Sequence, residues 1–369
     1  MRIFQVINVR WYNATAWYAL YLSRLLQDAG HEVLVLVQPG TAPETKAREM
    51  GLRTAALDLN TVNPLRLGGT IARMVGLLRD LRPDVVNCHR GEGFVLWGLL
   101  RPLAGYKLIR TRGDQRLPRS NAVNRWLHAC VADAVVVTNR RMAEHFLHDM
   151  RTPERSVWLV HGGVDTGRFH FDPEGRERVR AEFGYEPEHR VVGLLGRFDQ
   201  VKGQRETIHA VSRLYHERGR REVRLMLAGF ESAMDRARVE RWIEEHDAAR
   251  FTIITGRRDD VAACISAMDV GVVASLWSEA IARAALEIMA CDRPLLSSDV
   301  NVMPDLVPPR AMFPAGDVGA MTDRIERALT DGPYLESLME EERRTMSQLT
   351  PREFVTRTLS LYQRLLDRD

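Results

Sequence analysis

The chain has 369 residues, 45% of them hydrophobic and 27% charged, with a formal net charge of +3 at pH 7. These values are typical of a folded globular protein and exclude a disordered chain, and the length suits two domains. No apolar run reaches the roughly 18 residues that a membrane-spanning helix needs. The apolar stretch after Met1 is too short for a secretory signal and predicts a first strand. The four cysteines lack the spacing of metal ligands or of a redox pair and are expected to be reduced cytosolic thiols.

Positive charge is concentrated in the first part of the chain. Residues 1–160 contain 22 Lys and Arg against 13 Asp and Glu, whereas the remainder is net acidic. A basic surface suits an anionic membrane or an acidic acceptor, and a solvated surface without a partner explains it equally well. No nucleic-acid partner is expected, because the sequence has neither an aromatic-and-basic platform nor a helix-turn-helix pattern.

Strand-like apolar runs alternate with helical patterns from end to end. The first series of expected strands is 3–7, 33–37, 84–88, 107–111, 134–138 and 157–160, and the second is 191–195, 224–228, 251–254, 270–273 and 294–297. A helix over 15–29, ending at Gly30, is one of the connections. The alternation predicts right-handed β-α-β units and an α/β fold of two Rossmann-like domains that face a cleft.

The polar stretch 171–178 separates the two series and is expected to be the domain junction. The predicted N-terminal domain is therefore 1–170 and the second domain 171–348. The tail from Tyr334 has a helical pattern with Pro351 at a helix start, so 349–369 is expected to form a C-terminal helix.

The stretch 191–203, VVGLLGRFDQVKG, carries the first candidate site. A predicted strand stops at Gly196, Arg197 and Lys202 lie five positions apart, and Gly203 opens a helical pattern. A Walker A loop is excluded because Gly203 is followed by Gln204, and the dinucleotide fingerprint is absent. A cationic pair beside a helix N-terminus could neutralise a diphosphate, although two solvated charges would explain the same residues.

The second candidate site is in 278–290, where Glu279 and Glu287 lie eight positions apart. In a helix capped by Ser278 or Glu279, the two carboxylates would be about 12 Å apart along the axis. That span suits a ligand with a sugar at one end, a ribose at the other and a pyrophosphate between them, since carboxylates accept hydrogen bonds from vicinal hydroxyls. The alternative is one glutamate that favours the helix dipole and one that is solvated.

Taken together, these stretches resemble the retaining glycosyltransferases of family 4, which share the GT-B fold. The motifs that carry the likeness are 30–33, 161–169, 196–203, 279–294 and 298–305, and they occur in the family's order over nearly the whole chain. The resemblance implies a C-terminal helix that crosses back to an N-terminal, acceptor-binding domain, with the nucleotide sugar held by the second domain.

The same resemblance assigns roles to residues. Arg197 and Lys202 would hold the donor diphosphate, Glu287 the ribose hydroxyls, and Glu279 would face the donor sugar; the catalytic set is Arg197, Lys202 and Glu279. Further donor-binding residues are expected at Gly256, Arg257, Ala280, Ile281, Ala282 and Arg283. Preorganised cations stabilise the charge that grows on a departing nucleoside diphosphate, so neither a metal nor another cofactor is expected.

The acceptor side departs from the family pattern. The first loop reads Trp-Tyr-Asn-Ala-Thr over 11–15 where a glycine pair is frequent, and Gly113 stands where relatives often carry a histidine. The acceptor-side candidates are Asn13, Thr15, His89, Arg112 and Asp114. Glycines usual in the family are also replaced at Ala280 and Ala282, at Asp292, and at Asn301 and Val302.

The leading hypothesis is a hexosyl- or related glycosyltransferase that moves a sugar from a nucleotide-diphosphate donor to a cell-envelope glycan or lipid-linked acceptor, such as lipopolysaccharide or capsule. The expected location is the cytoplasm, with peripheral contact at the inner face of the membrane through the basic N-terminal half. A non-catalytic nucleotide-sugar-binding protein and a nucleotide-sugar epimerase on the same fold are the alternatives. The donor base and sugar, the acceptor and the oligomeric state stay open.

Overall fold

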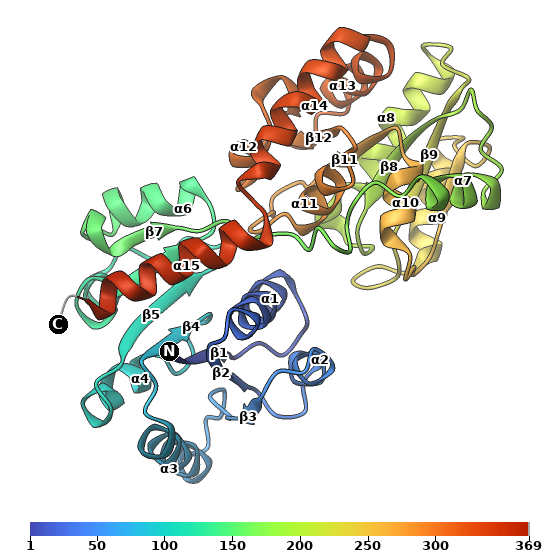
Figure 1. The fold of residues 1–369 in the computed structure, drawn as a ribbon. Coiled ribbons are helices and arrows are strands. Elements are labelled where there is room, and N and C mark those ends of the chain that lie inside the picture. Colours follow the sequence, from blue (N-terminus) through green and yellow to red (C-terminus); the bar gives the residue numbers. More distant parts are fainter. Residues whose placement is uncertain (368–369) are drawn as a thin grey trace. The chain divides into compact units, whose positions relative to one another are not determined.

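The computed structural model describes residues 1–367, and within them the chain forms two compact units (Figure 1). The first unit contains Met1–Gly162 together with the segment that begins at Pro351, and the second contains Gly163–Thr350. Residues 368 and 369, the end of the expected tail helix, lie outside the described residues.

The first unit is built on a parallel sheet with the strand order β3-β2-β1-β4-β5-β6-β7. Its strands are β1 (Arg2–Ile7), β2 (Glu32–Val37), β3 (Thr54–Ala56), β4 (Val85–Cys88), β5 (Lys107–Arg112), β6 (Ala134–Val137) and β7 (Val157–Leu159). Its helices are α1 (Ala14–Asp28), α2 (Ala42–Glu49), α3 (Pro64–Leu81), α4 (Phe94–Leu100), α5 (Ala122–Trp126), α6 (Arg140–Glu144) and α15 (Pro351–Leu366). Four short segments complete the unit: the 3-10 helices η1 (Arg101–Leu103) and η4 (Glu154–Ser156) and the π-helices η2 (Leu127–Val131) and η3 (His145–Asp149).

The second unit is a parallel sheet with the order β10-β9-β8-β11-β12-β13. Its strands are β8 (Arg190–Leu195), β9 (Val223–Ala228), β10 (Thr252–Ile254), β11 (Val270–Val273), β12 (Leu295–Ser298) and β13 (Met312–Phe313). Its helices are α7 (Pro173–Glu182), α8 (Gln204–His216), α9 (Arg236–Glu245), α10 (Val261–Ala267), α11 (Arg283–Ala290), α12 (Met303–Leu306), α13 (Val318–Thr330) and α14 (Gly332–Ser347), with short turns η5 (Gln200–Lys202) and η6 (Pro309–Ala311).

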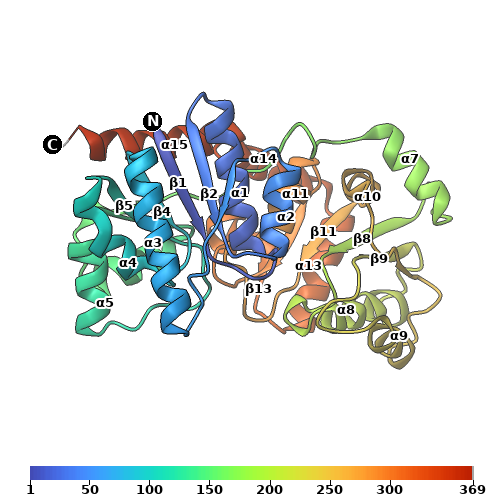
Figure 2. The ribbon, with the colours of Figure 1, turned by 90° about the horizontal axis from the view of Figure 1, so that it is seen from below.

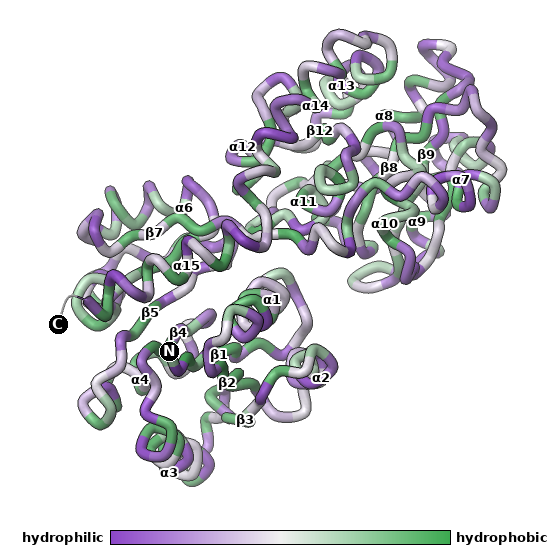
Figure 3. Tube along the Cα trace, viewed as in Figure 1, coloured by the Kyte–Doolittle hydropathy of each residue, from purple (hydrophilic) through white to green (hydrophobic). Residues whose placement is uncertain are grey.

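The strands are buried on both faces because helices cover both sides of each sheet. In the first unit, α1 and α2 lie on one side of β1 and β2, and α3 and α4 lie on the other (Figure 2). Figure 3 shows that the strands are mostly hydrophobic, whereas the helices around them carry both hydrophobic and hydrophilic residues. In β1 and β2, each residue after the first is buried, which is why these strands appear as near-continuous apolar runs in the sequence.

The predicted strands are all present, with bounds that differ by a residue or so. Two strands were not predicted: β3 and β13 lie at the outer edges of their sheets and are three and two residues long. A run of that length is too short for an apolar pattern to stand out from a loop. The helix expected over 15–29 is α1, and Gly30 takes the left-handed conformation (φ 84°) that ends it.

The second unit begins earlier than the junction expected at residue 170. Val164 and Phe169 are buried in the core of the second unit, so the chain has already entered that unit at Gly163. The polar stretch 171–178 is not a linker, because most of it belongs to α7. Asp172 caps this helix by accepting a 2.8 Å hydrogen bond from the amide of Gly175.

The C-terminal helix α15 returns to the first unit, as expected, and begins at Pro351. The ring of Phe354 packs edge-on against Tyr18 of α1, with ring centroids 4.8 Å apart. The hydroxyl of Tyr362 is buried between β1 and β4, where it accepts hydrogen bonds from Gln5 (3.4 Å) and Asn87 (3.1 Å). The helix is therefore fixed to the sheet by both apolar and polar contacts.

The loop after β8 is held against the loop after β11 at a position that tolerates only glycine. Gly203 has φ 69°, and a Cβ atom there would lie 2.1 Å from the carbonyl oxygen of Ala274. Beside this contact, the amide of Leu276 donates to the carbonyl of Val201 (2.8 Å). These contacts fix the position of Lys202 relative to the residues that follow β11.

We predict that Gly203→Ala destabilises the protein far more than the matched variant Gly219→Ala. Gly219 has the same φ of 69°, but a Cβ atom added there would meet no other atom within 4 Å. The backbone conformation alone costs about 1 kcal/mol, whereas the added clash at Gly203 raises the cost to about 3 kcal/mol or more. Urea unfolding of both variants measures the difference, and equal free energies of unfolding would contradict the close approach of the two loops.

Candidate functional site

The second unit has a topological switch point between β8 and β11. The chain runs from β8 to β9 and β10 on one side of the sheet and then returns to β11 on the other. Open parallel sheets bind ligands beyond the carboxyl ends of the strands at such a point. Arg197 and Lys202 follow β8, and Glu279 follows β11, so the structure brings the predicted catalytic set to this edge.

The central contact of this edge is an ion pair between Lys202 and Glu279. The Lys202 ammonium donates to Oε1 of Glu279, and the buried hydroxyl of Ser275 donates to the same oxygen (2.6 Å). The Glu279 side chain is only 7% exposed, whereas Lys202 keeps 22% of its surface open. Ser275 is itself fixed by Ser298 of β12, whose hydroxyl donates to the Ser275 carbonyl (2.6 Å).

Arg197 belongs to the same loop after β8 as Lys202 and is open to solvent over half of its side chain. Its guanidinium forms an ion pair with Asp199 (2.6 Å) and a hydrogen bond with the hydroxyl of Ser232 (3.2 Å). Asp199 also caps η5 by accepting from the amide of Val201 (3.2 Å). Neighbours on two different loops therefore orient the Arg197 side chain, and part of its guanidinium stays accessible to solvent.

Glu279 does not belong to the helix that contains Glu287. Helix α11 begins at Arg283, and its N-cap is Ala282 in the left-handed conformation (φ 51°), without a side-chain cap. The prediction that Ser278 or Glu279 caps this helix is wrong, and the separation of about 12 Å along one helix axis does not apply. The physical reason is that the Glu279 carboxylate is occupied by Lys202 and Ser275.

Glu287 is buried in the first turns of α11 and is paired with Arg283. The Arg283 Nε atom donates to Oε1 of Glu287 (2.6 Å), and the glutamate side chain is almost fully buried. Burial raises the pKa of Glu287 above its ordinary value, against the opposite influence of Arg283 and Arg168. The predicted donor residues Ala280, Ile281 and Ala282 form the turn between Glu279 and this helix.

The carboxyl ends of β9 and β10 add an aromatic group to the same edge. Phe230 follows β9 and is 42% exposed, and the guanidinium of Arg257 lies 5.5 Å from the centre of its ring. Gly256 precedes Arg257 with φ 73°. Arg258, by contrast, is held by Glu182 (2.6 Å) in addition to Asp260, so it joins the loop after β10 to the end of α7.

The sequence did not single out Phe230, Ser275, Asp199 or Ser232. Phe230 had a signal that could have been used, because an aromatic residue directly after a strand and a glycine is unusual on a solvated loop. Ser275 had none, since a serine after a buried strand is ordinary and only its contact with Glu279 gives it meaning.

In the first unit, the structure brings Thr15 into contact with the residue that follows β5, whereas Asn13 serves as the cap of α1. Asn13 caps α1 by accepting from the amide of Ala16 (3.0 Å), and the hydroxyl of Thr15 donates to the carbonyl of Gly113 (3.2 Å). The loops after β1 and β5 therefore meet at the carboxyl edge of this sheet.

Asp114 lies at the centre of three arginines on the same edge. Its carboxylate is 3.3 Å from Arg90, 3.3 Å from Arg112 and 3.6 Å from Arg110. Arg110 is buried, and its other hydrogen bonds go to backbone carbonyls, including that of Cys88 (2.9 Å). Of the acceptor-side candidates, Arg112 and Asp114 thus form one cluster.

His89 is placed differently from the other acceptor-side candidates. It is fully buried, and its Nε2 atom lies 2.7 Å from the amide oxygen of Gln5, which belongs to the network around Tyr362. Burial, with a smaller contribution from Arg110, lowers the pKa of His89 to about 3. His89 therefore lies in the buried interior of the first unit, not on its surface.

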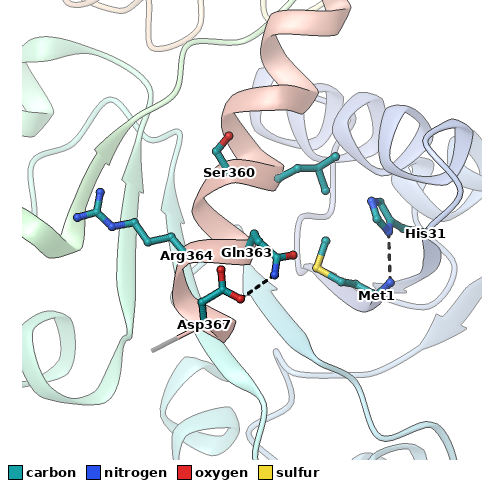
Figure 4. Close-up of a pocket in the computed structure, with 7 residues that line it drawn as sticks. Met1, His31, Ser360, Gln363, Arg364 and Asp367 are labelled. Atoms are coloured by element: carbon teal, nitrogen blue, oxygen red, sulfur yellow. Dashed lines mark hydrogen bonds between the residues drawn. The ribbon is translucent and has the colours of Figure 1, made fainter. Parts of the chain in front are cut away.

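An open hollow of about 810 Å³ lies at the other edge of the first sheet (Figure 4). Met1 and His31 precede β1 and β2, so their contact (3.3 Å) marks the amino ends of these strands. The remaining lining comes from α15 and the residue after it: Leu359, Ser360, Gln363, Arg364 and Asp367. None of the predicted site residues lines this hollow, which is therefore separate from the candidate site.

Over residues 1–367, no group of three or more His, Cys, Asp or Glu is arranged to hold a metal ion. The expectation that this protein needs no metal stays a prediction. In the same residues, no helix combines the length and the apolar character that a membrane crossing requires.

Comparison with solved structures identifies the fold class. A glycosyltransferase from Rickettsia africae superposes with a TM-score of 0.88 at 16% identity, over 100% of this chain and 99% of that one. Anabaena HepE, solved with UDP and glucose, gives 0.83 at 15% identity over 99% and 100%. The apo galactosyltransferase WaaB of the lipopolysaccharide outer core gives 0.72 at 13% over 98% and 99%. The chain has the GT-B fold of these glycosyltransferases.

Sequence comparison gives the family. Residues 15–168 match the family "Glycosyltransferase Family 4", and residues 189–331 match "Glycosyl transferases group 1". The chain belongs to this family of glycosyltransferases. A D-inositol 3-phosphate glycosyltransferase of Mycobacterium sp. (strain KMS) is 27% identical over 229 residues, which cover 60% of this chain and 50% of that protein. The matched part thus spans about half the length of such curated relatives.

We predict that Glu287→Gln stabilises the fold at neutral pH. The folded-state pKa of Glu287 is raised from 4.5, so the stability this carboxyl provides is full below that value and is lost as pH rises through the raised pKa. The variant's advantage in free energy of unfolding should therefore grow as the pH rises from 4.5 through the raised pKa, measured in urea. The exposed Glu244→Gln is the control, and an advantage that shrinks over this range would contradict the prediction.

Proposed function

We propose that this chain is a retaining glycosyltransferase that moves a sugar from a nucleotide-diphosphate donor to a cell-envelope glycan or lipid-linked acceptor. The observation that carries the proposal is the contact of Lys202 with Glu279 at the switch point of the second sheet, with Arg197 on the same loop as Lys202. Support comes from the Anabaena neighbour, whose structure holds UDP and glucose.

The donor-side roles follow from the chemistry of each group. Arg197 and Lys202 would hold the diphosphate, Glu287 would accept from the ribose hydroxyls, and Glu279 would accept from a hydroxyl of the sugar. The exposed face of Phe230, with Arg257 beside it, is suited to stacking of the nucleobase.

The two cations would act on the bond that breaks. As the bond between the sugar carbon and the β-phosphate oxygen breaks, its electron pair stays on the nucleoside diphosphate. The acceptor hydroxyl oxygen bonds to the carbon and gives its proton to an oxygen of the departing diphosphate. Positive groups fixed at the growing charge are stronger in this transition state than in the ground state. We propose that this charge stabilisation makes a metal unnecessary.

The acceptor would be bound by the first unit. Thr15 and Asn13 offer polar groups for acceptor hydroxyls, and the cluster of Arg112 and Asp114 offers charged ones. One curated relative is named for D-inositol 3-phosphate, and one structural neighbour is a galactosyltransferase of the lipopolysaccharide outer core. Inositol phosphate and the sugars of lipopolysaccharide are both rich in hydroxyls. An acceptor of this class, with an anionic group, fits the basic character of this unit.

A donor screen tests the proposal. The protein is mixed with a panel of UDP-, GDP- and ADP-sugars, and release of nucleoside diphosphate is followed with and without a membrane-lipid extract. We expect extract-dependent release from one donor, lowered on the order of 100-fold or more in Arg197→Ala. Arg205→Ala removes an exposed cation from nearby α8 and should leave the rate unchanged.

Two outcomes of the screen would count against transfer. Binding of a donor without release on any extract would favour a non-catalytic nucleotide-sugar-binding protein. Conversion of one nucleotide sugar into another without an acceptor would favour an epimerase.

We also propose that the first unit contacts an anionic membrane surface from the cytoplasmic side. Neighbouring elements α4 and the α5–η2 segment expose Leu99 (69%), Val123 (65%) and Trp126 (54%). Arg116 and Arg119 are exposed in the loop before α5. Exposed apolar side chains beside arginines suit insertion among anionic headgroups, at about 1 kcal/mol for each arginine near the surface.

Flotation with lipid vesicles measures this contact. We expect binding to phosphatidylglycerol-containing vesicles, lowered about tenfold or more in the double variant Leu99→Ser and Trp126→Ser because apolar burial is lost. Phe171→Ser, a partly exposed aromatic of the second unit, is the control. Equal binding to neutral vesicles, or no effect of the double variant, would contradict the proposed surface.

A further inference from the structure

Three cations of the proposed donor site are already paired with a carboxylate each. Lys202 contacts Glu279, Arg197 lies 2.6 Å from Asp199, and Arg283 lies 2.6 Å from Glu287. The site is thus close to electrically neutral, although a diphosphate brings at least two negative charges. A donor must therefore compete with carboxylates for the cations that are to hold it.

The Lys202–Glu279 pair is the most enclosed of the pairs that involve the predicted catalytic set. Glu279 is almost buried, whereas Arg197 is half-exposed and Asp199 also serves as a cap. A diphosphate that binds the Lys202 ammonium in place of Glu279 would leave a nearly buried carboxylate without its cation. That state is costly unless another hydrogen-bond donor to the carboxylate remains. The Ser275 hydroxyl, 2.6 Å from Glu279 Oε1, is that remaining donor.

The choice of lysine at position 202 agrees with an exchange of partners. Of the 52 Lys and Arg residues in the chain, only Lys46, Lys107 and Lys202 are lysines. Arginine at this position would offer a planar fork that binds a carboxylate through two parallel hydrogen bonds. A lysine ammonium is a compact point charge whose three donors can move from one oxygen to another.

Given the donor-binding role proposed above, we propose that Glu279 is a displaceable counter-ion of Lys202. The diphosphate replaces the Glu279 carboxylate on the ammonium when the donor binds, and the carboxylate is released toward the sugar. Ser275 is a positioning residue that holds the carboxylate in both states. When the nucleoside diphosphate leaves, Glu279 recaptures the ammonium, which assists product release.

The exchange predicts effects of opposite sign from two residues in contact. Glu279→Gln removes the competing charge, so a nucleoside diphosphate should bind about tenfold more tightly even though sugar transfer falls. Ser275→Ala removes the donor that supports the displaced carboxylate, so the same ligand should bind several-fold more weakly. Ser275→Thr keeps the hydroxyl and should restore the affinity. A general loss of structure would weaken binding in every variant.

Isothermal titration calorimetry with UDP, GDP and ADP on the full chain measures these affinities. Glu245→Gln, which removes an exposed carboxylate paired with Arg205, is the matched control and should leave them unchanged. If Glu279→Gln fails to fold, the comparison of Ser275→Ala with Ser275→Thr decides. Weakening that threonine restores supports the exchange, and equal affinity of Ser275→Ala and the wild type overturns it.

The results also separate this inference from the proposed function. If the wild type binds a nucleoside diphosphate and Glu279→Gln binds it equally or more weakly, the counter-ion role is overturned while donor binding stands. If no nucleoside diphosphate binds to the wild type or to any variant, both the donor site and the exchange are overturned.

Discussion

The close approach of the loops that follow β8 and β11 is the constraint on which the candidate site depends. Gly203 has no Cβ atom, and the carbonyl of Ala274 occupies the space where one would lie. The hydrogen bond from Leu276 to Val201 fixes the same approach. Because of it, Lys202 and Glu279, which are 77 residues apart, form an ion pair in a part of the sheet that is open to ligands.

Charge in the site is balanced by neighbouring side chains. Asp199, Glu279 and Glu287 each hold one cation, and Ser275 and Ser232 complete the set with neutral hydroxyl groups. This arrangement keeps the cations in place without a ligand and lowers the cost of burying them. If a diphosphate binds these cations as proposed, the same balance requires ion pairs to rearrange, so the carboxylates would matter for affinity as well as the cations.

The architecture could be predicted from the sequence because buried parallel strands are near-continuous apolar runs, which can be recognised without knowing what packs against them. The edge strands β3 and β13 were not predicted because they are too short to show a recognisable apolar pattern. Motif spacing singled out Arg197, Lys202, Glu279 and Glu287 as site candidates, and their roles stay predictions. It did not reveal their partners: Ser275 and Asp199 gain their roles through contacts alone. The start of α11 at Arg283 was missed because Glu279 is drawn to Lys202, and a local helix rule cannot include a partner so distant in sequence.

The most direct test is a crystal structure of the protein with a nucleoside diphosphate selected by the donor screen. We expect β-phosphate oxygens within hydrogen-bonding distance of Lys202 and Arg197, the ribose against Glu287, and Glu279 displaced from the ammonium but still bonded to Ser275. A diphosphate bound elsewhere, or bound beside an intact Lys202–Glu279 pair, would contradict the exchange of partners at Lys202.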